Sequence, residues 1–200
     1  MAHNAVQLPF AIAGRLENIM GQLLHADTDA KRKEVQGFFD AMGLQGVPPI
    51  PTTEQDSERE RLTVVLAYVE NETILGAICA TTPNAELDTA AAHGNSDVYS
   101  ALFEEVLLIH ALAVAPFSQG AGIGTSLLSA VEAAFIEDSS IRTVYGDTGQ
   151  DPKVHDFYRR AGYEVLPLGE PLVLSLAGGS TSWEISFGSP DWHHIRKDLR

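Results

Sequence analysis

The chain has 200 residues, of which 44% are hydrophobic, and it carries a formal net charge of −14 at pH 7. This length and composition suffice for one domain with a substantial core, and we treat residues 1–200 as a single domain. The negative charge argues against nucleic acid as a partner. The longest apolar stretch, around residues 106–117, is too short to span a bilayer, so we expect no membrane partner and a cytoplasmic protein.

The N-terminal part has apolar residues at helical spacing across residues 6–43, which predicts two helices. Their apolar faces consist of Leu16, Ile19, Met20, Leu23 and Leu24 in the first and Val35, Phe38, Phe39 and Met42 in the second. The next segment, residues 45–58, is rich in proline and polar residues and predicts a surface connection.

A β-hairpin is predicted next, because residues 61–69 and 73–82 are rich in Val, Ile, Leu and Tyr and flank a short polar turn. Cys79 lies within the second strand and is the only cysteine, which excludes an internal disulfide and favours a small buried side chain. Residues 83–99 are rich in turn-forming and small residues, and we expect a loop near the active site or a disordered excursion.

A strand over about residues 106–114 then leads through a glycine-rich turn into an amphipathic helix. Gly120, Gly122 and Gly124 leave the backbone of the turn free to adopt positive φ. Unpaired N–H groups at the start of a helix, together with its dipole, suit a pyrophosphate. We expect the N–H groups that converge on the anion to be those of Ala121, Gly122, Ile123, Gly124 and Thr125.

Other phosphate-binding motifs fit this turn poorly. The loop of nucleotide hydrolases requires a lysine after the glycines, and none follows here. The dinucleotide motif requires a third glycine at the position of Thr125, and an acidic residue about 20 positions further on at a strand end.

A strand over residues 141–146 and a second helix follow. Asp151 is the predicted N-cap, Pro152 occupies the first helical position and Gly162 ends the helix. Strands around Tyr163 and Trp183 complete a mixed α/β arrangement in one sheet. Two adjacent histidines near the end of the chain, at 193 and 194, lack a second ligand cluster, so we expect surface or strand-edge residues and no metal site.

Two motifs together resemble the GCN5-related N-acetyltransferase (GNAT) superfamily. The first is Gln119-x-x-Gly122-x-Gly124, preceded by Val114-x-Pro116, which resembles the superfamily's acetyl-CoA loop. The second resembles the signature NxxAxxFYxxxGF. Its matching residues are Phe157, Tyr158, Gly162 and Tyr163, while Asp151 and Val154 replace the usual Asn and Ala.

The resemblance implies a single-domain α/β fold with a mixed central β-sheet flanked by helices, and a cofactor-binding core at about residues 104–167. It implies direct transfer of an acetyl group from acetyl-CoA to a primary amine, with Tyr158 protonating the departing thiolate and the Leu112 N–H binding the thioester oxygen. Tyr158 as an aromatic that only packs against the sheet stays open. The cofactor-binding residues implied are Leu112, Ala113, Val114, Gln119, Gly120, Ala121, Gly122, Ile123, Gly124, Thr125 and Tyr158.

A base must take a proton from the acceptor amine, and His110 is the first candidate because histidine titrates near neutrality. Strand alternation places His110 on one face with Leu108, Leu112 and Val114, although a histidine that is merely hydrogen-bonded into the sheet stays an alternative. The reserve bases are Glu104 and Glu105, near the start of the strand.

The acceptor is not fixed by the sequence. The strand containing His110 is similar to that of arylalkylamine N-acetyltransferases, but Leu108 stands where those enzymes have a first histidine. The acidic composition favours a small cationic amine as the acceptor. The alternative is that the acidic surface only keeps the protein soluble. A protein or peptide N-acetyltransferase, a non-catalytic acyl-CoA sensor and a nucleotide-binding module are the alternatives, and a homodimer stays open.

Overall fold

The computed structural model describes residues 21–44, 48–59, 62–136, 140–185 and 191–199. A seven-stranded mixed sheet has the order β1-β2-β3-β4-β5-β9-β6, and β7 and β8 form a separate pair. The strands are β1 (Gln22–His25), β2 (Thr63–Glu70), β3 (Thr73–Thr81), β4 (Val106–Val114), β5 (Thr143–Thr148), β6 (Glu164–Val165), β7 (Leu172–Leu176), β8 (Thr181–Ile185) and β9 (His193–Asp198). The helices are α1 (Asp29–Ala41), α2 (Thr53–Arg59), α3 (Asn84–Ala92), α4 (Ser96–Glu105), α5 (Ile123–Ile136) and α6 (Pro152–Arg160), with short 3₁₀ turns η2 (Pro116–Ser118) and η3 (Ala177–Gly179).

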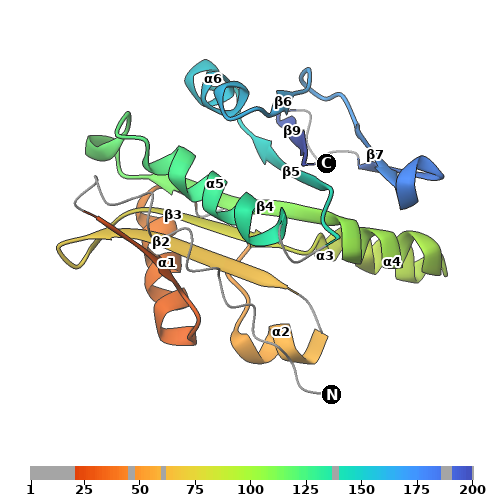
Figure 1. Cartoon of the computed structure of the whole chain (residues 1–200), viewed down its shortest axis with the longest axis horizontal. Helices are drawn as coiled ribbons and strands as arrows, with labels where there is room; N and C mark the ends of the chain where they lie inside the picture. Colours follow the sequence, from red (N-terminus) through yellow and green to blue (C-terminus); the bar gives the residue numbers. More distant parts are fainter. Residues whose placement is uncertain (1–20, 45–47, 60–61, 137–139, 186–190, 200) are drawn as a thin grey trace.

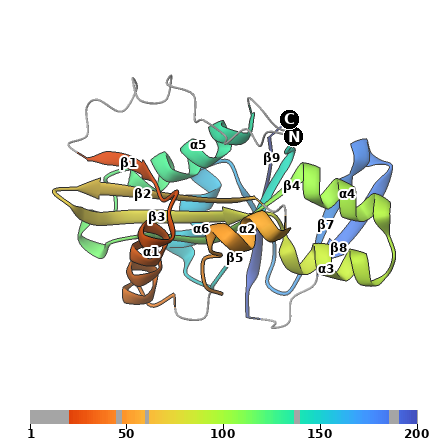
Figure 2. The same cartoon turned by 90° about the horizontal axis from the view of Figure 1, so that it is seen from below.

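Helices cover both faces of the large sheet (Figures 1 and 2). On one face, α5 and α6 bury a cluster that includes Leu127, Tyr158 and Tyr163. On the other face, α1 packs Val35 and Phe39 against small residues of β2, β3 and β4. This arrangement confirms the predicted fold class, a mixed central sheet flanked by helices.

The N-terminal prediction is right for the second helix and wrong at residues 23 and 24. The helix α1 begins after Thr28, whose hydroxyl accepts a hydrogen bond from the Lys31 N–H. Leu23 and Leu24 lie instead in β1, an edge strand paired antiparallel with β2, so pairing with a distant strand overrides their helical spacing. The rest of the first predicted helix lies mostly outside the described residues.

The predicted surface connection at residues 45–58 contains a helix that was not expected, α2. A local signal for it exists. The Thr52 hydroxyl accepts from the Gln55 N–H, and the Gln55 side chain accepts from the Thr52 N–H, which is a reciprocal capping box. The hairpin of β2 and β3 is confirmed, with positive φ at Asn71 and Glu72 in its turn.

The expected loop at residues 83–99 is wrong, because this segment forms α3 and most of the first half of α4. The Asn95 side chain caps α4 by accepting from the Val98 N–H. Both helices pack on the β7–β8 pair and form a second core whose buried residues include Leu87, Leu102 and Leu174. The run of alanines supplies helix-forming residues, not a flexible loop.

The C-terminal strands also differ from the prediction of one sheet, since β7 and β8 stand apart. The strand β9 was not predicted, and it lies inside the large sheet between β5 and β6. His194 is therefore buried and not at the surface, and His193 is half-buried.

Cys79 is buried in β3 as predicted, and burial raises the pKa of its thiol to about 12. Within the described ranges, no helix is long and apolar enough to cross a membrane.

Candidate active site

The centre of the large sheet opens where β4 and β5 separate. These strands pair in parallel from Val106 opposite Thr143 as far as Ile109 opposite Gly146. Beyond that pair, β4 continues along β3 to Val114, whereas β5 continues along β9 to Thr148. The result is a V-shaped opening between two central strands, which we call the splay.

His110 lies at the first position of the splay and at a β-bulge. Cys79 of β3 pairs with Ala111, but the next residue, Ala80, pairs with Ile109, so His110 is the extra residue. The bulge makes the predicted alternation wrong. Leu112 and Val114 pack with the α5 cluster, whereas Leu108 packs with the cluster formed by α3, α4 and β7.

The His110 side chain reaches the α1 side of the sheet. Its Nε2 lies 3.0 Å from the Pro48 carbonyl oxygen, in the connection between α1 and α2. Arg32 of α1 holds this connection in place, because its Nη1 donates to Pro51 O at 2.7 Å and to Asp56 Oδ2 at 2.6 Å. The contact with Pro48 therefore orients the imidazole on the face of the sheet opposite α5 and α6.

Backbone N–H groups of β4 point into the splay. The Ala115 N–H donates to Leu75 O on β3 at 2.8 Å. Since successive N–H groups of a strand point to opposite edges, the Ala113 N–H also faces β3, while those of Leu112 and Val114 face the side that β5 has left. The Leu112 N–H thus has the direction that an oxyanion donor at this position needs.

The glycine-rich turn places a helix N-terminus at the end of β4. Gly120 and Gly122 have φ of 83° and 84°, a region that favours glycine. The first intrahelical bond of α5 runs from the Ser126 N–H to Gly122 O, so the preceding N–H groups are open to a ligand. The Gln119 side chain donates to Val114 O at 3.3 Å and fastens the turn to β4.

Two details of this turn differ from the prediction. The Ala121 N–H points back toward Ser118 O at 3.4 Å, so it is not free for the anion. Gly124 is not one of the described glycines that have positive φ. A Cβ atom there would lie 3.1 Å from two ring carbons of Phe157, so this glycine allows α5 and α6 to approach.

Tyr158 follows Phe157 on α6 and is 6% exposed. Its ring packs edge-on against Phe157 and Tyr163, with centroids 5.1 and 5.6 Å away. Its hydroxyl has no hydrogen-bond partner among the residues described, and burial raises the pKa of this phenol well above its usual range. The phenol is therefore held in its neutral form.

Glu105 does not lie close to His110 at the splay. It ends α4 just before β4, and its Oε2 accepts from the Ala177 N–H at 3.1 Å. At a rise of about 3.3 Å per residue, Glu105, five residues before His110, lies about 16 Å from it. Glu104 is exposed at the same helix end.

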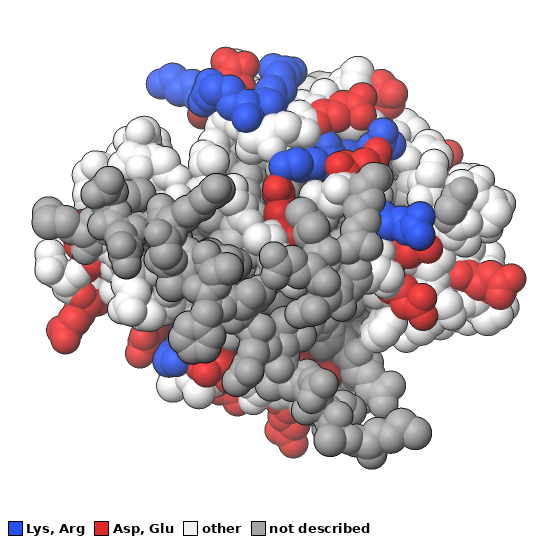
Figure 3. Space-filling model, viewed as in Figure 1, with Lys and Arg blue, Asp and Glu red and all other residues white. Residues whose placement is uncertain are grey.

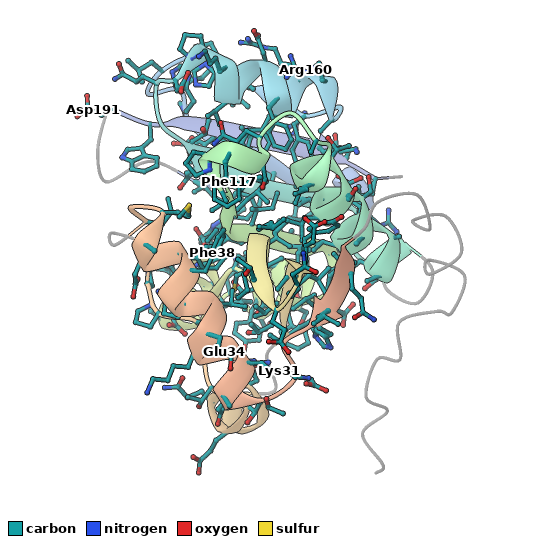
Figure 4. All side chains as sticks on the ribbon, turned by 90° about the vertical axis from the view of Figure 1, so that its left-hand side faces the viewer. Lys31, Glu34, Phe38, Phe117, Arg160 and Asp191 are labelled. Atoms are coloured by element: carbon teal, nitrogen blue, oxygen red, sulfur yellow. The ribbon has the colours of Figure 1, made fainter. Side chains whose placement is uncertain are left out.

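Basic side chains gather over α6 (Figure 3), and Phe157 of this helix lies against Gly124 in the first turn of α5. Arg159 and Arg160 are both exposed there, and Arg159 pairs with Asp156 at 3.4 Å. Phe117, on η2 beside the turn, is 80% exposed. In Figure 4 it lies between α6 and Phe38 of α1, so the turn carries an apolar surface next to its N–H groups.

Four polar residues near the splay were missed from the sequence: Glu86, Tyr145, Asp147 and His194. Asp147 directly follows the pair at which β4 and β5 separate. A signal for it was present, since an acidic residue comes immediately after the strand predicted over residues 141–146.

Among the cavities described, one of about 490 Å³ lies elsewhere, between β1, α1 and the β2–β3 turn, with His25, Lys31 and Glu34 in its lining.

The sequence model of the Acetyltransferase (GNAT) family matches residues 24–163 of this chain. Solved structures share the fold. An acetyltransferase of the GNAT family from Staphylococcus aureus Mu50 is 14% identical with a TM-score of 0.56, covering 90% of this chain and 99% of its own. No curated protein matches the sequence.

Two further structures contain a cofactor. An aminoglycoside 6'-N-acetyltransferase complexed with coenzyme A is 13% identical with a TM-score of 0.54, covering 91% of this chain and 98% of its own. NAA60 of Arabidopsis thaliana in complex with acetyl-CoA is 13% identical with a TM-score of 0.56, covering 89% of this chain and 98% of its own. At these identities the similarity establishes the fold.

Proposed function

The chain belongs to the GNAT family of acetyltransferases, and on this premise we propose that it moves an acetyl group from acetyl-CoA directly to a primary amine of a small cationic acceptor. The observation that carries the proposal is the splay of β4 and β5, with an open helix N-terminus at one end and Tyr158 packed beside it. The proposed unit is one domain, with its cofactor-binding core at about residues 104–167.

The turn before α5 is the proposed pyrophosphate site. Gly122, Ile123, Gly124 and Thr125 offer N–H groups that no intrahelical bond uses, and the helix dipole adds a partial positive charge there. The exposed arginines of α6 add positive potential near a polyanionic ligand, against the net charge of −14. The Gln119 side chain fastens the turn to β4 through its hydrogen bond to Val114 O.

Acetyl transfer in the splay needs an oxyanion donor and an acid. The Leu112 N–H takes the first role for the thioester oxygen, and Ala113 and Val114 line the same strand segment. As the amine nitrogen bonds to the carbonyl carbon, the carbon–sulfur bond breaks and Tyr158 donates its phenolic proton to the leaving thiolate. Burial keeps the Tyr158 phenol protonated until the thiolate leaves.

The amine must also lose a proton, since free primary amines have a pKa near 10 and are mostly charged at neutral pH. His110 is the proposed base. It reaches the α1 side of the sheet whereas Tyr158 packs on the α5 side, so a thioester in the splay would lie between base and acid. Glu105 is the weaker candidate, because its carboxylate is bonded to the Ala177 N–H at the far end of β4.

Release of the CoA thiol across a panel of arylalkylamines, polyamines, aminoglycosides, amino acids and peptides tests the proposal. We expect stimulation by a cationic small amine. Tyr158→Phe keeps the ring and removes only the acid, so kcat should fall about 100-fold, with little change in acetyl-CoA affinity.

Tyr99→Phe is the matched control, since Tyr99 lies on α4 in the second core. Unchanged turnover in Tyr158→Phe would remove this residue from the mechanism. Acetyl-CoA binding without thiol release for any amine would favour the non-catalytic alternative, and release with peptides alone would favour a peptide acceptor.

A further inference from the structure

A polar cluster occupies the face of the sheet opposite Tyr158, at the β5 side of the splay. Tyr145 and Asp147 alternate with Val144 and Gly146 on β5, and Val144 packs in the α5 cluster. Tyr145 packs with α3, α4 and β7 on the other face. Asp147 therefore lies on the face from which His110 approaches the splay.

Asp147 is built to present a fixed carboxylate. Its Oδ1 lies 2.7 Å from Nδ1 of His194 on β9, and the side chains are 45% and 1% exposed respectively. The backbones of the two residues are paired in the sheet. A buried ring on β9 thus orients a carboxylate that is partly exposed to solvent and comes directly after the last pair of β4 and β5.

Two more oxygen-bearing groups lie beneath it. Tyr145 is 2% exposed, and its hydroxyl makes no hydrogen bond of good geometry within the described chain. Glu86 Oε2 is also buried without such a hydrogen bond. Burial raises the pKa of the Glu86 carboxyl, and the neighbouring Tyr145 hydroxyl lowers this pKa by a smaller amount. Buried oxygens without good partners are costly unless something else uses them.

We propose that Asp147, positioned by His194 and backed by Glu86 and Tyr145, binds a second ammonium group of the acceptor and so selects diamines and polyamines. The inference rests on the proposed function. The reacting amine is an unsuitable occupant, because a carboxylate beside it would hold the proton that must leave. A second, non-reacting ammonium carries no such conflict and can pair with the exposed part of the Asp147 carboxylate.

The spacing suits a short diamine. The pair after Ile109 and Gly146 would be His110 and Asp147 if the strands had stayed together, and paired strands lie about 4.8 Å apart. The splay widens this separation. Three or four methylenes place two amines about 5–6 Å apart in an extended chain, so one nitrogen reaches the splay while the other contacts Asp147.

The test compares 1,3-diaminopropane and 1,4-diaminobutane with propylamine and butylamine as acceptors. For the wild type we expect kcat/KM at least about tenfold higher for the diamines. Asp147→Asn should remove this preference through KM for the diamine, with kcat/KM for the monoamines within about twofold. Asp147→Glu, which keeps the charge, should retain part of the preference.

Glu34→Gln is the matched control, because Glu34 is an exposed carboxylate on α1, away from the splay (Figure 4). It should leave the preference unchanged. Equal use of diamines and monoamines by the wild type, or an equal loss for both in Asp147→Asn, overturns the inference. Acetylation of other amines in the panel but of no diamine also overturns it while the proposed function stands, and no acetylation of any amine defeats both.

Discussion

Gly122→Ala tests the phosphate turn most directly. Gly122 has φ of 84°, and a Cβ atom there would meet nothing within 4 Å. The substitution therefore adds no clash and costs only the left-handed backbone, about 1–2 kcal/mol. For a protein of this size that corresponds to a decrease in Tm of about 2–8 °C.

The effect on ligand affinity is separate. If the backbone relaxes to negative φ, the N–H groups of Gly122 and Ile123 turn away from their shared direction. Each hydrogen bond to a charged group is worth about 1.5–3 kcal/mol, so loss of one should weaken acetyl-CoA binding about 10- to 150-fold. Isothermal titration calorimetry with acetyl-CoA measures the affinity, and thermal unfolding measures the stability cost.

Gly43→Ala is the matched control, because Gly43 ends α1 with φ of 82° and also has open space around it. It should cost the same stability and leave acetyl-CoA affinity intact. Equal affinity in wild type and Gly122→Ala would refute the assignment of this turn to the pyrophosphate. An equal loss of affinity in Gly43→Ala would show that the effect comes from general destabilisation.

Three other substitutions have defined outcomes. Glu132→Gln leaves the Lys197 ammonium without its 2.7 Å carboxylate partner and should cost about 2–4 kcal/mol in urea unfolding. Glu86→Gln should stabilise the protein more at pH 8 than at pH 4. Burial raises the folded pKa of Glu86, so stability falls as pH rises from the unfolded pKa through the folded one, and Gln removes that loss. His110→Ala should lower turnover most at low pH, where fewer amines are neutral; an unaltered pH profile would move the role elsewhere.

Local signals explain which elements were predictable. For α6, Asp151 accepts from the Lys153 N–H and Gly162 has φ of 87°, so both ends are set by residues next to the helix. The hairpin of β2 and β3 is equally local. By contrast, Leu23 and Leu24 show helical spacing, and only pairing with β2, more than 40 residues away, makes them a strand.

The candidate site divides in the same way. The glycine turn and Tyr158 lie in contiguous motifs and were therefore predicted from the sequence. The bulge at His110 depends on the register of β3 against β4, which strand alternation alone does not contain. Asp147 and His194 are 47 positions apart, and they meet because β9 inserts beside β5.

The unpredicted strand β9 links the two sides of the proposed reaction. Its Ile195 packs with the α5 cluster, and Lys197 binds Glu132 of α5 and the Ala161 carbonyl at the end of α6. His194 points to the other face and holds Asp147. Alternation along one strand therefore positions the helix of the proposed acid on one face and the carboxylate proposed to bind the acceptor on the other. A substitution that shifts the register of β9 should impair cofactor and acceptor binding together, whereas Asp147→Asn should impair only the acceptor.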